Sequence, residues 1–188
     1  MDKNFYHAVE QNPIIGAVKD FEGLEKSLQS DLEVIFILFG DICNIAEITE
    51  KITAVGKIAL VHMDLIVGLS SKEISVDYIK NNTTANGIIS TKLPIIKRAK
   101  ELGLFTVYRI FVIDSMSLKN IETQPKAIKA DFIEILPGTM PRTIQKICKI
   151  SKQPVIAGGL ISEKVEVMEA LDAGAIAIST TNQMIWEL

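Results

Sequence analysis

Short apolar runs recur along almost the whole chain, and a polar turn and an amphipathic, helix-forming segment separate each run from the next. Runs of this length, rich in β-branched residues and bounded by turn residues, predict β-strands. Near-continuous apolar strands are typical of a parallel sheet that is covered on its outer side. The eight expected strands are residues 14–18, 34–39, 58–64, 87–89, 105–111, 132–136, 154–159 and 175–181.

The number and order of these elements favour one fold. Alternating strands and helices indicate an α/β domain. Eight strands favour a small (β/α)8 TIM barrel over an open doubly wound sheet, and no Gly-x-Gly-x-x-Gly motif follows the first strand. The length of 188 residues predicts a single TIM-barrel domain over residues 1–188, short for a class in which about 250 residues is typical. Residues 3–11 are expected to form a short helix that covers the bottom of the barrel.

The composition, the N-terminus and the cysteines indicate the cellular location that we expect. Hydrophobic residues make up 48% and charged residues 23% of the chain, as in ordinary soluble domains. The N-terminus is polar without a signal core, and no apolar run approaches the roughly 20 residues of a membrane helix. Cys43 and Cys148 lie far apart and form no metal or redox motif. We therefore expect a cytoplasmic protein with reduced thiols and no membrane partner.

The last two expected strands end in residues suited to an anion. Strand seven ends in Gly158-Gly159, and strand eight ends in Ser179-Thr180-Thr181. Glycines let the backbone approach an anion closely, and hydroxyl groups add hydrogen-bond donors. Because TIM barrels frequently bind phosphate after strands seven and eight, this pair predicts a phosphate site. The alternative is a tight strand-to-helix turn without a ligand.

Ionisable residues stand at or near the ends of other expected strands. Burying them is unfavourable unless they pair with one another or face a ligand. A mouth lined in this way suits a small polyol phosphate, whereas the alternative is a set of structural ion pairs that closes the barrel. No zinc-ligand spacing is present, so no metal is expected. The candidates for contact with the polyol are His62, Asp64, Lys92, Arg109 and Glu134.

Charge is unevenly distributed along the chain. Residues 92–152 hold 12 Lys and Arg against 5 Asp and Glu, which leaves 8 of the 20 basic and 18 of the 23 acidic residues for the rest. Such asymmetry can mark a face that binds a polyanion, although solvated outer faces of barrel helices are the alternative. Lys119, Lys126 and Lys129 would join the basic helices into one surface. The candidates for RNA contact are Arg142, Lys146, Lys149, Lys97 and Arg98.

Several of these segments, taken in order, resemble one known family, the glycerol uptake operon antiterminator regulatory proteins. The resemblance covers nearly the whole chain, and Thr181 is a departure because a second serine is expected there. Each motif alone is weak, whereas the ordered series is specific. The segments are His62–Leu69, Gly87–Lys92, Arg109–Ser115, Glu134–Gly138, Ala157–Ile161 and Ser179–Thr181.

The resemblance implies a transcription regulator without enzymatic activity. It would respond to glycerol 3-phosphate as effector, use no cofactor, bind the leader mRNA of a glycerol-utilisation operon and prevent premature termination. A homodimer would double the basic surface. One alternative is a phosphosugar isomerase, epimerase or synthase on the same barrel, with His62, Asp64 and Glu134 as general acid and base. Another is a phosphate-ligand sensor that acts through a protein partner.

Overall fold

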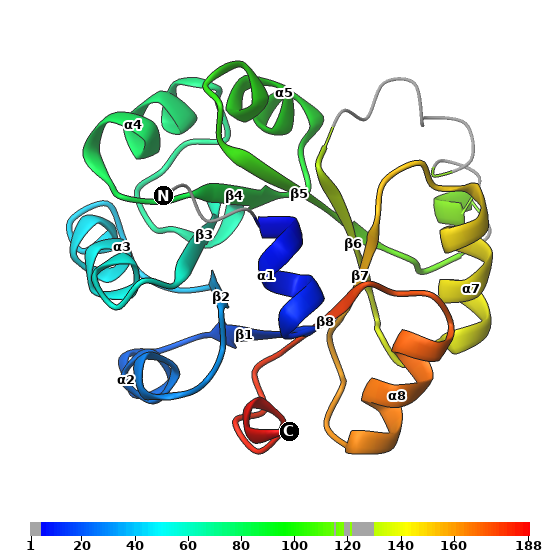
Figure 1. Cartoon of the computed structure of the whole chain (residues 1–188). Helices are drawn as coiled ribbons and strands as arrows, with labels where there is room; N and C mark the ends of the chain where they lie inside the picture. The colour runs from blue at the N-terminus through cyan, green and yellow to red at the C-terminus, as the bar shows by residue number, and fades with distance from the viewer. Residues whose placement is uncertain (1–4, 115, 119–120, 122–129) are drawn as a thin grey trace.

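The computed structural model describes residues 5–114, 116–118, 121 and 130–188. Eight parallel strands pair in chain order, and β8 pairs with β1 to close a barrel, which confirms the predicted TIM-barrel fold (Figure 1). Six of the eight strands end within a residue of their predicted ends. The strands are β1 (Ile14–Val18), β2 (Val34–Ile37), β3 (Ile58–His62), β4 (Gly87–Ser90), β5 (Phe105–Phe111), β6 (Phe132–Leu136), β7 (Val155–Gly158) and β8 (Ala177–Thr180).

Helices surround this barrel and bury its outer face (Figure 1). None of the helices among the described residues is long and apolar enough to cross a membrane. The helices are α1 (Phe5–Gln11), α2 (Phe21–Gln29), α3 (Ile45–Ala54), α4 (Ile74–Asn82), α5 (Leu93–Glu101), α7 (Pro141–Ile150) and α8 (Lys164–Asp172), and the 3-10 segments are η1 (Met63–Leu65) and η2 (Ile185–Glu187).

Helix α1 closes the end of the barrel at which the strands begin. Figure 1 shows it lying across the centre of the barrel. The ring of Phe5 lies 4.3 Å from the ring of Phe132 and 5.9 Å from that of Phe105, between ring centroids. Phe5 is fully buried in the inner core, together with Phe36 and Phe132. The predicted cover at the bottom of the barrel is therefore confirmed, and the opposite end remains as the mouth.

The prediction for the end of β3 was wrong by two residues. The strand ends at His62, and Asp64 lies in the 3-10 segment η1. The alternation of a strand therefore does not set the direction of the Asp64 side chain. Hydrogen bonds from the end of β4 hold its carboxylate instead. Periodicity could not detect this change, because Leu65 and Ile66 continue the apolar run.

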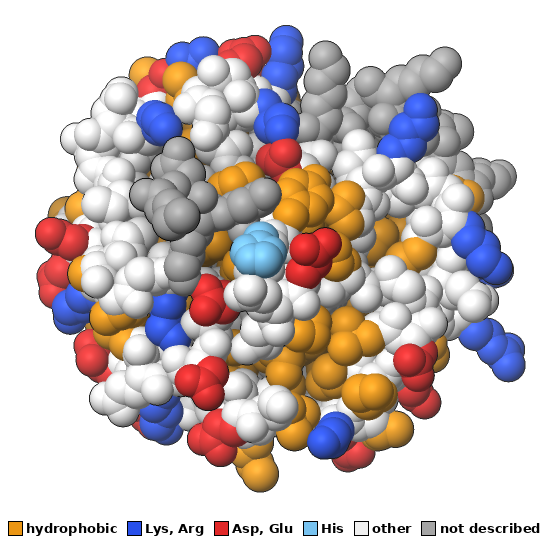
Figure 2. Space-filling view, in the orientation of Figure 1, with side chains coloured by type: hydrophobic (Ala, Val, Ile, Leu, Met, Phe, Trp, Pro, Cys, Tyr) orange, Lys and Arg blue, Asp and Glu red, His pale blue; other side chains and the backbone are white. Residues whose placement is uncertain are grey.

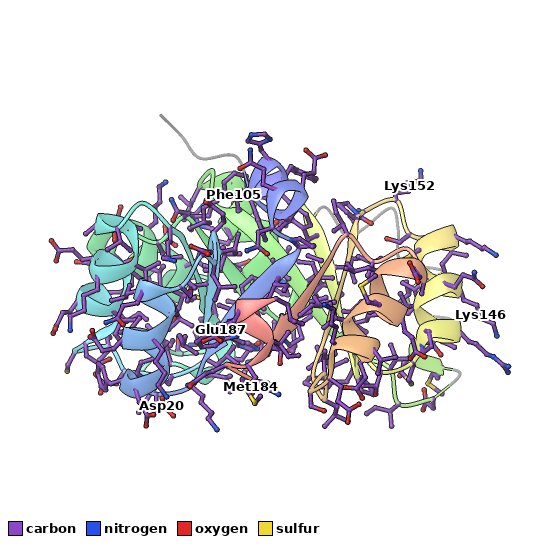
Figure 3. All side chains as sticks on the ribbon, turned by 60° about the horizontal axis from the view of Figure 1, so that its bottom comes forward. Asp20, Phe105, Lys146, Lys152, Met184 and Glu187 are labelled. Atoms are coloured by element: carbon purple, nitrogen blue, oxygen red, sulfur yellow. The ribbon has the colours of Figure 1, made fainter. Side chains whose placement is uncertain are left out.

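The outer wall beside β8 is formed by a 3-10 segment, η2, where an α-helix covers other strands such as β1 and β7. After β8, the three-residue segment η2 packs its Trp186 side chain, 5% exposed, against β1. Gly16 allows this contact, since a Cβ atom there would lie 3.5 Å from the Trp186 ring and 2.5 Å from Leu32. A groove of about 1090 Å³ runs along the outer wall, lined by α2, α8 and the residues around η2, among them Met184 and Glu187 (Figure 3). It lies outside the barrel and does not contain the predicted site residues.

Candidate functional site

The predicted site residues converge at the mouth, because parallel strands end at the same side of a barrel. Asp20 and Met184, which follow β1 and β8, mark this end in Figure 3. Gly158 pairs in register with Ser179, so the ends of β7 and β8 lie side by side. Arg109 likewise pairs in register with Glu134.

A buried ion pair joins β5 to β6 and extends to β8. The Arg109 Nε donates to Glu134 Oε2 at 2.6 Å, and the Ser179 hydroxyl donates to Glu134 Oε1 at 2.5 Å. Glu134 is 0% exposed and Arg109 is 7% exposed, so the charges compensate one another away from water. Among the described residues, the two terminal nitrogens of Arg109 donate no hydrogen bond. They are therefore available to an anion in the mouth.

Gly158 is required by this network. A Cβ atom at this position would lie 2.5 Å from Glu134 Oε1 and 2.6 Å from the Ser179 hydroxyl. A side chain would therefore separate the two groups. Gly159 and Leu160 both have positive φ, at 75° and 62°, and turn the chain away from β7. Leu160 is the one described residue other than glycine with this backbone conformation, and sequence reasoning missed it.

Backbone amides are the donors that remain between β7 and β8. Among the hydrogen bonds of the described residues, none starts from the amides of Gly159, Leu160 or Thr181. The Thr180 hydroxyl donates to the Ile161 carbonyl at 2.7 Å, and the Ser179 hydroxyl donates to Glu134. These two hydroxyls are used inside the protein, so an anion here would depend chiefly on amide donors.

The backbone amides at the start of α8 are not free to act as further donors for an anion. The Glu166 carboxylate accepts hydrogen bonds from the amides of Ser162 and Glu163 at 2.7 and 3.0 Å. The helix is thus capped by its own side chain in a capping box. The positive end of this helix already carries a negative charge.

A second polar cluster joins β3 to β4. The Asp64 carboxylate accepts hydrogen bonds from the Thr91 amide at 2.8 Å and from the Ser90 hydroxyl at 3.1 Å. The Lys92 ammonium lies 3.2 Å from Asp64 and donates to the Ser71 hydroxyl at 2.6 Å. Burial opposes ionisation of Asp64, but the Thr91 amide and Lys92 keep its pKa below the ordinary value. The carboxylate is charged and holds Lys92 at the mouth.

The pKa of His62 is affected by a charged residue from each of the two clusters, Arg109 and Asp64. Its side chain is 4% exposed, and its Nδ1 atom has no hydrogen-bond partner among the described residues. Burial, with the nearby Arg109 charge, lowers the pKa of His62 to about 4, although Asp64 acts in the opposite direction. The imidazole is therefore neutral near pH 7, with one buried nitrogen unsatisfied.

Protonation of His62 should make stability depend on pH. Its pKa is near 6.5 when unfolded and about 4 when folded, so between these values only the unfolded chain takes up the proton. The free energy of unfolding should therefore fall by up to roughly 3 kcal/mol as the pH drops from 6.5 to 4, and be unaffected by His62 above that window. Urea unfolding of the wild type and of His62→Gln measures this. Parallel pH profiles for the two proteins would refute the assignment.

The basic candidates separate into paired and unpaired groups. Arg98 on α5 is held by Asp77 and Glu101. On α7, the exposed side chains of Arg142, Lys146 and Lys149 take part in none of the ion pairs among the described residues.

Lys146 on α7 and Lys152 just after it project from the outer wall in Figure 3, and basic side chains stand out along this edge in Figure 2. Lys97 on α5 is also exposed and takes part in no ion pair among the described residues. The bridging residues Lys119, Lys126 and Lys129 lie outside the described residues, so the continuity of the basic surface remains a prediction.

The polar mouth groups are not arranged as a metal site. Among the residues that the structure describes, no cluster of three or more His, Cys, Asp or Glu side chains is placed to hold a metal ion. Arg109 and Lys92 add positive charge beside the two carboxylates. This arrangement suits an anionic ligand that also carries hydroxyl groups.

Sequence comparison identifies the family. Residues 14–186 match the model of the glycerol-3-phosphate responsive antiterminators. The chain belongs to this family. The matched residues cover nearly the whole barrel, including every strand that contributes to the mouth, and this confirms the family resemblance predicted from the sequence.

Two solved antiterminator structures and one further relative support this assignment. The glycerol uptake operon antiterminator regulatory protein of Listeria monocytogenes is 31% identical with a TM-score of 0.90, covering 100% of this chain and 98% of its own. An antiterminator-related protein of Thermotoga maritima is 31% identical with a TM-score of 0.82, covering 93% and 98%. The uncharacterized protein YgcP of Escherichia coli is 42% identical over 97% of this chain and 95% of its own. Solved enzymes at 14–17% identity share the fold alone.

Proposed function

We propose that this antiterminator family member is a cytoplasmic regulator that binds glycerol 3-phosphate at the barrel mouth and leader mRNA on its outer wall. The observation that carries the effector site is the set of unsatisfied polar groups at the mouth. Within the part of the chain that the structure describes, these are the terminal nitrogens of Arg109 and the amides between β7 and β8, with the buried His62 Nδ1 near them. The protein uses the effector as a signal, performs no chemistry on it and needs no cofactor.

The two ends of the effector would contact different groups at the mouth. The phosphate would accept hydrogen bonds from the amides of Gly159, Leu160 and Thr181 and from Arg109, which together supply directed donors and one positive charge. The glycerol hydroxyls would reach His62, Asp64 and Lys92, which lie at the ends of β3 and β4. Glu134 would keep Arg109 in position, and Ser179 and Thr180 would hold the turn.

Gly159→Val should weaken glycerol 3-phosphate binding at least about tenfold while the protein stays folded. Valine is rarely tolerated at the φ of 75°, and its Cβ atom would lie 3.1 Å from the Leu136 side chain, so the turn and its amides must move. Gly103→Val is the matched control, since Gly103 has a φ of 71° with nothing within 4 Å of its Cβ position. Calorimetry should show normal effector binding for the control. Equal affinities for the two variants would place the phosphate elsewhere.

We place the RNA site on α7, because its three exposed cations take part in no ion pair among the described residues and share one helical face. The leader transcript of a glycerol-utilisation operon should bind the wild-type protein, with affinity that depends on glycerol 3-phosphate. Phosphate contacts would dominate and make the binding salt-dependent. Filter binding with and without the effector tests the proposal. RNA binding that is absent at saturating effector would favour a sensor that acts through a protein partner.

The alternative of a phosphosugar enzyme has less support from the site. Glu134 accepts hydrogen bonds from both Arg109 and Ser179, so the arrangement stabilises a fixed carboxylate rather than a proton shuttle. The lowered pKa of His62 also leaves little of it protonated near neutral pH. NMR of the protein with glycerol 3-phosphate should show binding shifts and no new product resonance.

A further inference from the structure

The side of α8 that borders the groove on the outer wall carries apolar side chains between two opposite charges. Lys164, Met168 and Asp172 are spaced four residues apart, so they lie on one face of the helix. All three side chains are exposed, and Met168 is at the midpoint. Val165, which is 55% exposed, and Leu171 lie on either side of Met168. These five residues form the α8 face, which has a positive end, an apolar centre and a negative end.

The two charges of the α8 face do not stabilise their own helix. Lys164 is the first residue of α8 and Asp172 is the last, and no basic residue lies in the last turn. A cation at the start of a helix and a carboxylate at its end both oppose the helix dipole. Within the ranges that the structure describes, neither side chain takes part in an ion pair. Both charges are therefore available to charges on another molecule.

The groove beside α8 has the size and the lining that suit one more helix. Helices α2 and α8 stand on either side of the short η2 segment (Figure 1). The groove between them has a volume of about 1090 Å³. A nine-residue helix is about 13.5 Å long and about 10 Å wide, so it occupies roughly 1,000 Å³. The apolar lining of the groove comes from α8 and the residues around η2, and it includes Met168, Leu171, Met184, Trp186 and Leu188.

We propose that two copies of the chain pair through α8, with the α8 of each copy lying in the groove of the other. A two-fold axis at Met168 makes the two helices antiparallel, so Lys164 of each copy meets Asp172 of the other. The apolar centres of the two faces pack against one another between these ion pairs. The antiparallel arrangement also brings the opposite ends of the two helix dipoles together.

The order of the charges favours a second copy over RNA as the occupant of the groove. Two identical antiparallel helices satisfy both charges only when the cation and the carboxylate are equally far from the axis. Lys164 and Asp172 meet this condition, since each is four residues from Met168. The exposed carboxylates of Glu169 and Asp172 would repel RNA phosphates. The pairing goes beyond the proposed function, because it involves neither the barrel mouth nor the basic side chains of α7.

Sedimentation velocity of the full-length protein tests this pairing. The wild type should form a dimer. Lys164→Glu and Asp172→Lys should each weaken it at least about tenfold, because each substitution places like charges opposite one another at two symmetric positions. Both substitutions suit the dipole of α8 better than the native residues, so the helix should stay folded. The double variant reverses the order of the charges and should return the dissociation constant to within about threefold of the wild-type value.

Two further variants test the position of the axis and the effect of charge alone. Met168→Glu should weaken the dimer at least about tenfold, because it places two carboxylates together at the axis. Lys80→Glu is the matched control, since Lys80 is exposed on α4, across the barrel from α8 (Figure 1). The control should dimerise as the wild type does. A wild type that is monomeric at about 100 μM, a double variant as weak as the single variants, or equal weakening by the control overturns the proposal.

Discussion

A variant with Arg142, Lys146 and Lys149 all replaced by Glu is expected to lose leader-RNA affinity by at least about 100-fold. These three side chains are exposed on α7, and no carboxylate neutralises them among the described residues. Each phosphate contact releases counterions, so losing three should reduce the slope of log affinity against log salt by about 2 to 3. Filter binding over a range of salt concentrations measures both quantities, and calorimetry should show unchanged effector binding.

The control must change the net charge equally without touching α7. Lys26, Lys51 and Lys80 lie on α2, α3 and α4, on the far side of the barrel from α7 (Figure 1). Replacing all three with Glu disturbs surface ion pairs that are worth little stability. RNA affinity should fall far less than in the α7 variant. Equal losses would mean that the overall charge matters, and wild-type values for the α7 variant would move the RNA face elsewhere.

Glu134→Leu is expected to lower the free energy of unfolding by about 3–5 kcal/mol, because it leaves the Arg109 guanidinium buried without its counterion. It also removes the acceptor for the Ser179 hydroxyl. Adding Arg109→Met to this variant should restore much of the loss, since a buried pair is more easily replaced whole than broken. Urea unfolding of the two single variants and the double variant gives the coupling energy.

An exposed pair of the same type provides the comparison. Glu22→Leu breaks the Glu22–Lys26 pair, whose side chains are 76% and 52% exposed, and should cost no more than about 1 kcal/mol. If Glu134→Leu were as mild, the mouth pair would not be acting as a buried structural anchor. If Arg109→Met deepened the loss, Arg109 would stabilise the fold through groups other than Glu134.

The barrel could be predicted because each of its strands has a recognisable pattern within a short stretch of sequence. Each strand is buried on both faces, so a strand such as Val34–Ile37 appears in the sequence as an unbroken apolar run. The positions of Arg109 and Glu134 in their expected strands also marked both as candidates for the mouth. Their bond, however, depends on the register of β5 against β6. The bond from Ser179 to Glu134 spans 45 residues and has no local signature.

Other features of the site depend on loops and on neighbouring helices. Asp77 on α4 neutralises Arg98 on α5, so a residue that counts as basic in the sequence contributes little free charge. Ser71 reaches Lys92 from the loop after β3, where no motif marks it. The positive φ of Leu160 was also invisible, because glycine is the residue that normally indicates this conformation. The hydroxyl pair Ser90-Thr91 was the visible signal for the partners of Asp64.

The packing of Trp186 gives the molecule a built-in optical reporter. It is the single tryptophan of the chain, so intrinsic emission excited at the red edge comes from one place. Its indole Nε1 donates at 2.9 Å to the carbonyl of Thr180, the residue before the amide of Thr181. Movement of this turn alters the hydrogen bond and the polarity around a side chain that is 5% exposed. Fluorescence of the unlabelled wild-type protein can therefore follow events at the end of β8 in real time.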